Sequence, residues 1–467
     1  MMWVNFSIAV LLTCLPIAVI LARTIDPGTP GRTACILGYS LLLGIVGITA
    51  LMRIFNLLNI PLSFWGLGGA WAAISLLATL IPREARPTRD TAAMPKLAPS
   101  VTALPGKLGI FITVVCLALI ALRLYSLGLE SLLRPTFAWD SKQHWGLVAR
   151  EIFELREIRQ YIGRIDWLEG DSSSYTNLHP SYPLTVPLTQ AWFALALGVW
   201  DESAAGAPWL LFYVALGSIF YAQSRIAGAG IPLATVGTYM LLSLPYLNIQ
   251  VALPGYADLF LACVFLGAVS SLYNWGNHQA RWQLGLCAAC AVICVTVKQE
   301  GFFWLLSILP AVLLIRIGWR RSLPVFAFAL VLVLLLLFFL PPTTVIAGQS
   351  LEAIDLRYRP AGWQPIYFSL LVHDNWHLLV YLFLLALPTL FVLKDDLPLH
   401  AIGLCLLCAF GLYVILFIAT DRVSGAVTYT AINRVGLQLM PSVAFFTLQV
   451  FSSLANQRGM TLSSSNN

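Results

Sequence analysis

The side chains best suited to chemistry lie between residues 137 and 145, where Asp140 and His144 stand between Trp139 and Trp145. Asp140 directly precedes a stretch of helical pattern, so it has an ordinary use as an N-cap. A carboxylate held beside a tryptophan at a helix start also suits a general base that deprotonates an acceptor hydroxyl. His144 lies four residues later on the same helix face, where an imidazole can orient the carboxylate, assist proton transfer or coordinate a metal.

Two proline-bounded turns carry further candidates. His179 and Tyr182 belong to the sequence HPSYP at 179–183, whose prolines make a rigid start to an apolar helix. The histidine is either part of this structural turn or a substrate ligand. Asp258 closes the sequence PGYAD at 254–258, where it either satisfies first-turn amides or binds a sugar hydroxyl or a cation.

Basic residues at the ends of apolar segments form the last group of candidates. Lys298 and Glu300 interrupt an apolar hairpin and either neutralise each other or hold an anionic group together. Arg434 begins the last apolar segment, where it either snorkels to the interface or grips a lipid phosphate. Arg357 and Arg359 lie among interfacial aromatics, and this arginine pair indicates anion binding.

The composition is that of a polytopic membrane protein, with 59% hydrophobic and only 10% charged residues among 467. The net charge of +6 is spread over short segments between apolar runs, which argues against nucleic acid as a partner. The nine cysteines all fall in apolar runs, so we expect packing roles and no disulfide framework. The first apolar run has no basic residues before it and is expected to be a retained span.

The elements that must position these residues are membrane helices, and the chain divides into four regions. We expect three N-terminal spans in 1–81, a basic cytoplasmic linker in 82–107, the main transmembrane region in 108–454 and a polar cytoplasmic tail in 455–467. The fold expected is all-α, with about 13 crossings from about 14 apolar segments. The segment 184–200 is the shortest of its group and is expected to enter the membrane only in part.

The basic linker orients the chain. The span after it points outward, so residues 128–183 and 341–376 form external loops. In the first loop, Trp145, Val148, Ile152 and Leu155 recur at helical spacing, which predicts an amphipathic helix lying flat on the membrane. All the candidate residues then fall at the external membrane face. Because a charge at membrane depth costs about 2.5–3.5 kcal/mol, we expect them to form one site.

The order of these motifs resembles bacterial polytopic glycosyltransferases of the GT-C superfamily. The resemblance covers residues 108–454 and rests on five sequences in order: WDxxxxW from Trp139, HPxYPL from His179, GYAD from Gly255, KxEG from Lys298 and NRxxLQLxP from Asn433. It implies that Asp140 is the catalytic base and that Lys298 and Arg434 hold the donor phosphate. Superfamily members with paired acids in the first loop differ from this chain, in which Ser141 and Lys142 follow Asp140, so a divalent metal is left open and no other cofactor is expected.

The function expected from the resemblance is transfer of a sugar from a polyprenyl-phosphate donor to a lipid or glycan acceptor. The enzyme would sit among the lipids of the bacterial inner membrane, with its site facing the periplasm or the exterior, and would serve envelope glycan or glycolipid synthesis. A transporter or flippase of an anionic lipid or solute is the alternative from another class, although we see no internal repeat. A scaffold for envelope assembly with a degenerate site is the third.

Overall fold

The computed structural model describes residues 2–80, 106–170, 174–177, 179–346 and 349–465, and this part of the chain is almost entirely helical. The predicted linker 82–107 lies outside it except for its last two residues. Eight of the described helices are long and apolar enough to cross a membrane. They are α1 (Met2–Thr24), α2 (Arg32–Leu57), α4 (Gly106–Leu133), α9 (Ala207–Ile226), α12 (Asp258–His278), α14 (Gly301–Phe339), α18 (Leu397–Ala419) and α20 (Ile432–Ser465).

Five shorter apolar helices of 10–17 residues accompany them. They are α3 (Phe64–Thr79), α7 (Thr185–Leu197), α10 (Ile231–Leu242), α13 (Arg281–Val297) and α17 (Leu379–Thr389). The structure thus confirms an all-α membrane protein, whereas the number of crossings, about 13, stays a prediction. The 13 residues of α7 extend only about 20 Å at 1.5 Å per residue, and all of them are buried in the protein.

Short elements complete the described chain. The helices are α5 (Gly146–Leu155), α6 (Arg164–Leu168), α8 (Glu202–Ala205), α11 (Pro245–Ala252), α15 (Leu351–Ile354), α16 (Trp363–Tyr367) and α19 (Val423–Val427), with π-helical turns η1 (Ser141–Trp145) and η3 (Phe368–Val372) and the 3-10 turn η2 (Pro360–Gly362). Strand β1 (Tyr161–Ile162) pairs in parallel with β2 (Tyr175–Thr176), and β3 (Val345–Ile346) pairs antiparallel with β4 (Gln349–Ser350).

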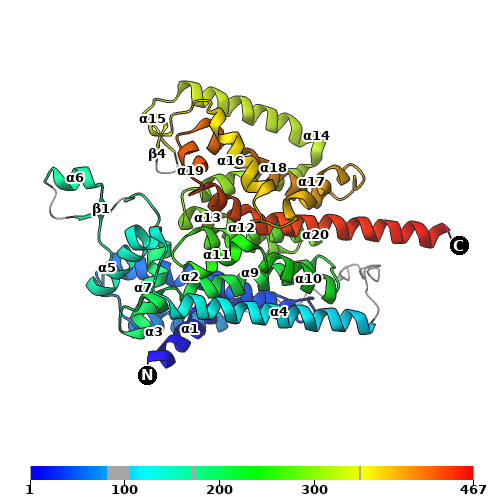
Figure 1. Ribbon diagram of the computed structural model, residues 1–467. Helices are drawn as coiled ribbons and strands as arrows, with labels where there is room; N and C mark the ends of the chain where they lie inside the picture. Colours follow the sequence, from blue (N-terminus) through cyan, green and yellow to red (C-terminus); the bar gives the residue numbers. More distant parts are fainter. Residues whose placement is uncertain (1, 81–105, 171–173, 178, 347–348, 466–467) are drawn as a thin grey trace.

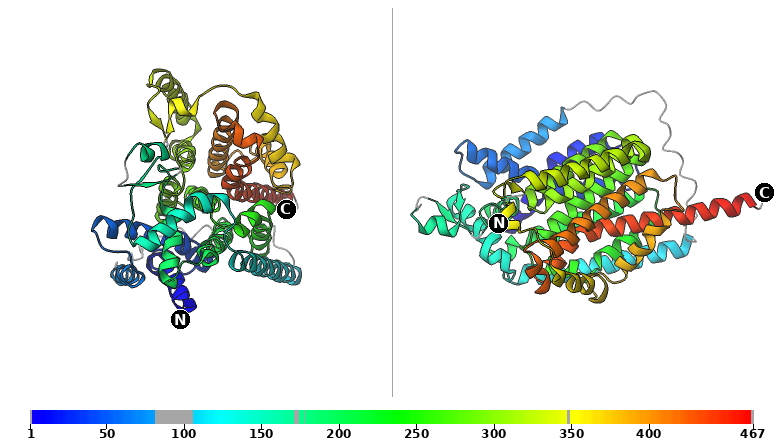
Figure 2. Two further views of the ribbon diagram at one scale, coloured as in Figure 1. Left: turned by 60° about the vertical axis from the view of Figure 1, so that its left-hand side comes forward. Right: turned by 90° about the horizontal axis from the view of Figure 1, so that it is seen from above.

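The long helices share one direction, and the loops gather at one end of them. Figure 1 shows α4 and α14 on opposite edges of the bundle, with α6, α15 and α19 together at its left end. The C-terminal end of α20 lies at the right end, and the view from above in Figure 2 shows the same separation. Both predicted external loops are therefore on the same side of the helices.

The core is centred on α12, which is buried from Asp258 to Trp275. Helices α2, α9, α13, α18 and α20 pack around it in one apolar cluster. Tyr39 on α2 donates or accepts a 2.6 Å hydrogen bond with Ser271 on α12. Helix α2 therefore belongs to the main core, whereas α3 packs in a second apolar cluster.

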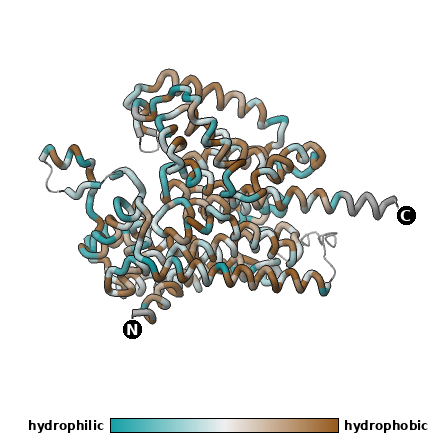
Figure 3. The backbone as a smooth tube through the Cα atoms, in the orientation of Figure 1, coloured by the Kyte–Doolittle hydropathy of each residue, from teal (hydrophilic) through white to brown (hydrophobic). Residues whose placement is uncertain are grey.

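The periphery is apolar and exposed, as lipid-facing surface must be. Helix α4 exposes Ile110, Phe111 and Val114, and the second half of α14 exposes Phe328, Val331 and Phe338. Both helices are coloured mainly as hydrophobic in Figure 3.

One predicted span, residues 231–250, is wrong for a local backbone reason. The segment 231–250 is not one helix, because Pro245 lacks an amide hydrogen and restricts Leu244, and the chain breaks there into α10 and α11. The two apolar helices predicted on either side of Arg316 to Arg321 are the two parts of α14, which is kinked at Gly318, where the backbone is non-helical (φ 71°, ψ 169°). The segment predicted as a polar tail continues the helix α20 as far as Ser465.

The prediction that the apolar face of an external helix lies on the membrane is also wrong, because that face packs against protein. The helix forms at the expected place, as η1 followed by α5, but Trp145, Val148 and Ile152 are at most 1% exposed. They pack with Leu188 and Trp192 of α7 or with the main core, so this apolar face meets protein and not lipid.

Candidate functional site

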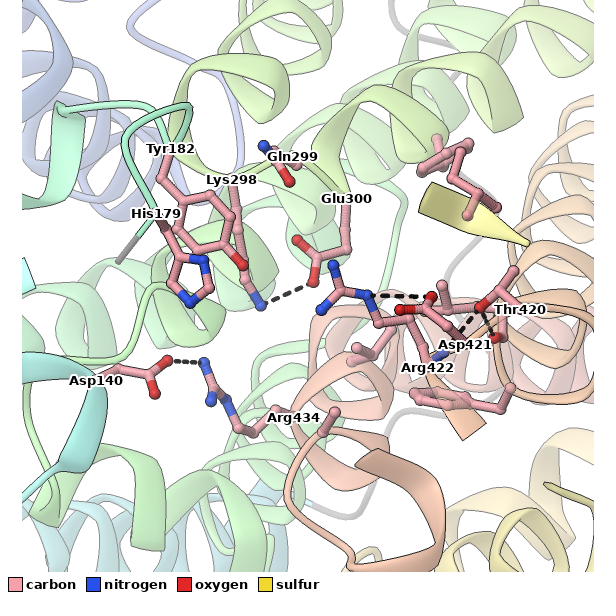
Figure 4. A pocket seen from close by; sticks show the side chains of 16 residues that line it. Asp140, His179, Tyr182, Lys298, Gln299, Glu300, Thr420, Asp421, Arg422 and Arg434 are labelled. Carbon is pink, nitrogen blue, oxygen red and sulfur yellow. Dashed lines mark hydrogen bonds and ion pairs between the residues drawn. The ribbon is translucent and has the colours of Figure 1, made fainter. Parts of the chain in front are cut away.

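The largest group of interacting charges surrounds a cavity of about 260 Å³ at the end of the bundle that carries the loops. Six of the predicted site residues line it: Asp140, His179, Tyr182, Lys298, Glu300 and Arg434. Figure 4 shows them facing one another from different segments of the chain. The charged site predicted from residues far apart in the sequence is therefore a single cluster.

The cluster forms where several helices begin. Asp258 is the first residue of α12, Glu300 immediately precedes α14, and Arg434 is the third residue of α20. Asp140 immediately precedes η1. Because unpaired amides and the positive end of the helix dipole lie at each helix start, this end of the bundle favours negative charge.

Asp258 is the centre of the cluster although it does not line the cavity. Its side chain is 0% exposed and accepts hydrogen bonds from Lys298 Nζ at 2.9 Å, Arg434 Nε at 2.8 Å and Gln438 Nε2 at 2.6 Å. Trp304 Nε1 donates to Gln438 at 2.6 Å and so fixes that amide. The buried carboxylate thus holds two cations side by side, in bonds stronger than those between neutral groups.

Arg434 links the buried acid to the exposed one. Its Nη2 forms a salt bridge with Asp140, whose side chain is 25% exposed, while its Nε is bound to Asp258. The guanidinium also lies over the ring of Tyr256, 4.3 Å from the centroid. Three partners therefore set its position.

Lys298 is held between Asp258 and Glu300, with 2.9 Å to each. Burial alone lowers the pKa of this lysine, but the two carboxylates outweigh burial and raise the pKa above its ordinary value. The ammonium is therefore charged at neutral pH, and one of its three donors is left beyond these two salt bridges.

Two glycines explain the motifs that contain these acids and bases. Gly255 has φ +117°, and a Cβ there would lie 2.2 Å from Cβ of Ser141, so only glycine lets the turn before Asp258 approach the segment of Asp140. A Cβ at Gly301 would lie 1.8 Å from the carbonyl oxygen of Cys294. Close packing of α13 on the start of α14 sets the turn that carries Lys298 and Glu300.

An aromatic group borders the carboxylate side of the cavity. The rings of His179 and Tyr182 are stacked, with centroids 4.7 Å apart and an interplanar angle of 15°. Trp145 is stacked behind Tyr182 at 5.3 Å. Burial lowers the pKa of His179 and raises that of Tyr182, so both side chains are held in their neutral forms near pH 7.

His144 lies behind this group and does not have the partner that we expected. Its Nδ1 forms a 2.6 Å hydrogen bond with Oδ1 of Asn177, not with Asp140, because the π-helical turn and the loop before α7 bring the asparagine against the ring. Burial lowers the pKa of His144 to about 4, although the bond to Asn177 opposes that shift. A neutral, buried ring is a support for Tyr182 and His179, which it contacts edge-on.

Arg357 and Arg359 are not in the cluster, so the prediction that places them in the site is wrong. Both form salt bridges with Asp355, which compensates one of their two charges locally. Their backbone amides donate to the carbonyl groups of Ala419 and Ile418, at the end of α18. The segment therefore forms part of the wall, through Ile354, and not of the charged site.

The sequence interpretation missed several residues that the structure places here. Gln438 lies one helical turn after Arg434, and this i, i+4 spacing is the signal that identifies it. Asp421 and Arg422 line the far wall of the cavity, opposite His179. Asn177 and Tyr256 lie next to residues that were recognised, but as neutral groups they carry no membrane cost that would mark them.

The described residues contain no group of three or more His, Cys, Asp or Glu side chains arranged to hold a metal ion. Asp140, which lines the cavity, and Asp258, which is buried behind it, are both bound to Arg434. A divalent ion at Asp140 would compete with this guanidinium. All nine cysteines are free, which agrees with the absence of a disulfide framework expected from the sequence.

Comparison with known proteins adds no assignment. No family model matches the chain, and neither a curated protein nor a solved structure matches it.

Proposed function

We propose that the protein is a membrane glycosyltransferase that moves a sugar from a polyprenyl-phosphate donor to an acceptor hydroxyl. One observation carries the proposal: a partly exposed carboxylate, Asp140, and two cations, Lys298 and Arg434, border the same cavity at one end of a membrane bundle. A carboxylate can accept the proton of the acceptor while cations stabilise the phosphate that leaves. The proposal includes a bacterial inner membrane, with the site at its external face.

The cations suit a departing lipid phosphate. Asp258 fixes both, and each keeps donors that its salt bridges do not use. An arginine can bind two phosphate oxygens at once, and a nearby ammonium adds charge. Preorganised donors of this kind stabilise a developing anion by about 2.7–4 kcal/mol each.

Asp140 is the proposed general base, and we propose that it is either bound to Arg434 or free to contact the acceptor. With no donor present, Arg434 binds Asp140 and occupies one of its carboxylate oxygens. A phosphate that engages Arg434 competes with Asp140 and releases the carboxylate to the acceptor. General-base help of this kind contributes roughly 10²- to 10⁴-fold to the rate.

The walls of the cavity provide for the rest of the donor. The stacked rings of His179 and Tyr182 offer a flat surface to a sugar beside Asp140. Phe303, Leu416 and Phe417 also line the cavity and suit the first isoprene units.

The test measures binding and turnover separately. Undecaprenyl phosphate, the lipid product, should bind the wild-type protein, and Lys298→Gln should weaken this binding about tenfold, the loss of roughly one charged hydrogen bond. Asp140→Asn should bind it at least as tightly as the wild type, since Arg434 is freed. The same variant should lose 10²-fold or more of transfer activity, assayed in vesicles with a panel of polyprenyl-phosphate sugars.

Two results would reject the proposal. If a folded Asp140→Asn protein turns over at the normal rate, Asp140 is not the general base. Movement of fluorescent polyprenyl phosphate between the leaflets of vesicles, at a rate that depends on Arg434, would assign the site to a transporter or flippase instead.

A further inference from the structure

A second cavity, of about 540 Å³, lies where the C-terminal end of α12 meets α13 and α14. Its polar side is formed by Trp275, Gln279, Arg281 and Arg316. Helix α12 extends over 21 residues from Asp258, or about 30 Å, before it reaches this point. The cavity is therefore at the opposite end of the bundle from the candidate functional site and is independent of the function proposed there.

The two arginines of this cavity carry unbalanced charge. Within the part of the chain that the structure describes, no carboxylate forms a salt bridge with Arg281 or Arg316, and no acidic residue lines the cavity. This contrasts with Arg434 and Lys298, each of which meets two carboxylates. A cavity with two positive charges and no internal acid attracts an anion.

One of the arginines is held in place by an aromatic ring. The guanidinium of Arg316 lies 4.6 Å from the centroid of Trp275, whose side chain is 2% exposed and therefore fixed in the core. A cation over a buried indole keeps its N–H groups free at the ring edge for another partner. The arginine is thus positioned in advance, which reduces the entropy lost when it binds an anion.

An apolar strip continues from the arginines along α13. Leu284, Gly285 and Ala288 line this part of the cavity, and a Cβ built at Gly285 meets nothing within 4 Å. From Arg281 to Ala288 the helix rises about 10 Å toward the middle of the bundle. The small side chains in this strip leave open space above Gly285, where a hydrocarbon chain can lie.

We propose that this cavity binds one anionic glycerophospholipid, with its phosphate between Arg281 and Arg316 and an acyl chain over Gly285 and Ala288. Charge, an aromatic-held arginine and an adjoining apolar strip occur together at the end of membrane helices, which is where headgroups lie. A zwitterionic lipid is disfavoured because its ammonium finds no acidic partner in the cavity. The ligand is thus a structural lipid such as phosphatidylglycerol, distinct from any substrate of the first cavity.

The experiment is native mass spectrometry of the full-length protein released from detergent that contains equal amounts of phosphatidylglycerol and phosphatidylcholine. We expect one phosphatidylglycerol molecule to be retained in preference to phosphatidylcholine. In the double variant Arg281→Gln/Arg316→Gln, its retention should fall about tenfold. The matched control is Arg320→Gln/Arg321→Gln, which removes the same charge from exposed positions of α14 outside the cavity lining and should retain the lipid within about twofold.

The variant Gly285→Leu tests the apolar strip without changing charge, since the added side chain would occupy the open space above Gly285. It should also lose the bound lipid, while keeping the thermal midpoint of the wild type in phosphatidylcholine. Equal losses from the two arginine pairs would show diffuse attraction to surface charge and would overturn the proposal. So would a wild-type protein that retains both lipids equally, or full retention by Gly285→Leu.

Discussion

At the scale of single residues, the site depends on a buried acid that never meets the cavity. Asp140 borders the cavity, but Asp258 determines where Lys298 and Arg434 lie. A carboxylate that is 0% exposed and accepts three charge-assisted bonds is strongly favoured as an anion while its partners remain. Removal of one member of such a cluster leaves the others buried and uncompensated.

Replacement of Asp258 is therefore expected to destabilise the whole protein. Asp258→Asn should lower the free energy of unfolding by about 3–5 kcal/mol, because two buried cations lose their common partner. The matched control is Glu300→Gln, which removes a 23% exposed carboxylate from the same lysine and should cost less. Thermal unfolding in detergent measures both, and equal midpoints for the two variants would contradict the central position of Asp258.

His144 should make stability depend on pH in a known direction. Burial lowers its pKa from 6.5 to about 4, so the imidazole is neutral in both folded and unfolded protein above pH 6.5. Below this value the unfolded chain takes up a proton that the folded chain refuses until about pH 4. Stability is thus lost as the pH falls through this window, by up to about 3 kcal/mol.

The measurement compares wild-type protein with His144→Gln, whose amide can still bond to Asn177. Unfolding is followed between pH 7 and pH 4. The stability difference between the two proteins should shift in favour of the variant as the pH falls. Parallel curves would show that the ring titrates normally in the fold.

The free-energy cost of placing a charge in the membrane explains which site residues can be recognised from the sequence. Charges at the ends of apolar segments are expensive, so Asp140, Asp258, Lys298 and Arg434 stand out and do converge. Arg357 and Arg359 stand out in the same way, but both bind Asp355, outside the cluster. Asn177 carries no charge and is evident only once the fold brings it against His144, and the only sequence signal of Gln438 is its i, i+4 spacing from Arg434.

At the scale of helices, the length of an apolar run predicts that a helix forms better than it predicts where the helix ends or what it packs against. The apolar runs of α2, α9, α12 and α18 form helices where expected. The continuity of other helices depends on single residues, since Pro245 divides one predicted span and Gly318 is the kink between the two parts of α14. Periodicity identified the buried face of α5 but not its partner, because an apolar stripe fits lipid and α7 equally well.

The junction of α13 and α14 should tolerate no side chain at Gly301. Gly301→Ala would force Cβ against the backbone of Cys294, at 1.8 Å, and the start of α14 would have to move. Lys298 and Glu300 would move with it. We expect at least a tenfold loss of undecaprenyl phosphate binding, since misplacement of a charged donor costs on the order of 1.4 kcal/mol or more.

Gly128→Ala is the control for this change. Gly128 is also helical, and a Cβ there meets nothing within 4 Å, so the variant should bind normally and be slightly more stable. If Gly301→Ala binds the lipid as well as this control does, the tight junction does not set the position of Lys298.

At the scale of the whole molecule, the two ends of the bundle have different charge patterns. Acids and bases pair with each other around the first cavity, whereas the arginines of the second cavity lack acidic partners. The first end also carries α6, α15 and α19 (Figure 1). Such an asymmetric bundle is expected to keep one orientation in the membrane, with its arginine-rich end in the cytoplasm.

Site-directed labelling checks this orientation. Glu169, at the end of α6, and Asp395, between α17 and α18, are both exposed and lie at opposite ends of the helices. In a cysteine-free background, Glu169→Cys in intact spheroplasts should react with a membrane-impermeant maleimide, while Asp395→Cys should react only after the membrane is opened. As the control, both cysteine variants should react with the maleimide once the membrane is opened, which shows that each thiol is reactive. Labelling of both positions in intact spheroplasts would mean that the two ends do not face opposite sides of a membrane. Labelling of Asp395→Cys alone would mean that the candidate site, and with it the proposed acceptor, is on the cytoplasmic side.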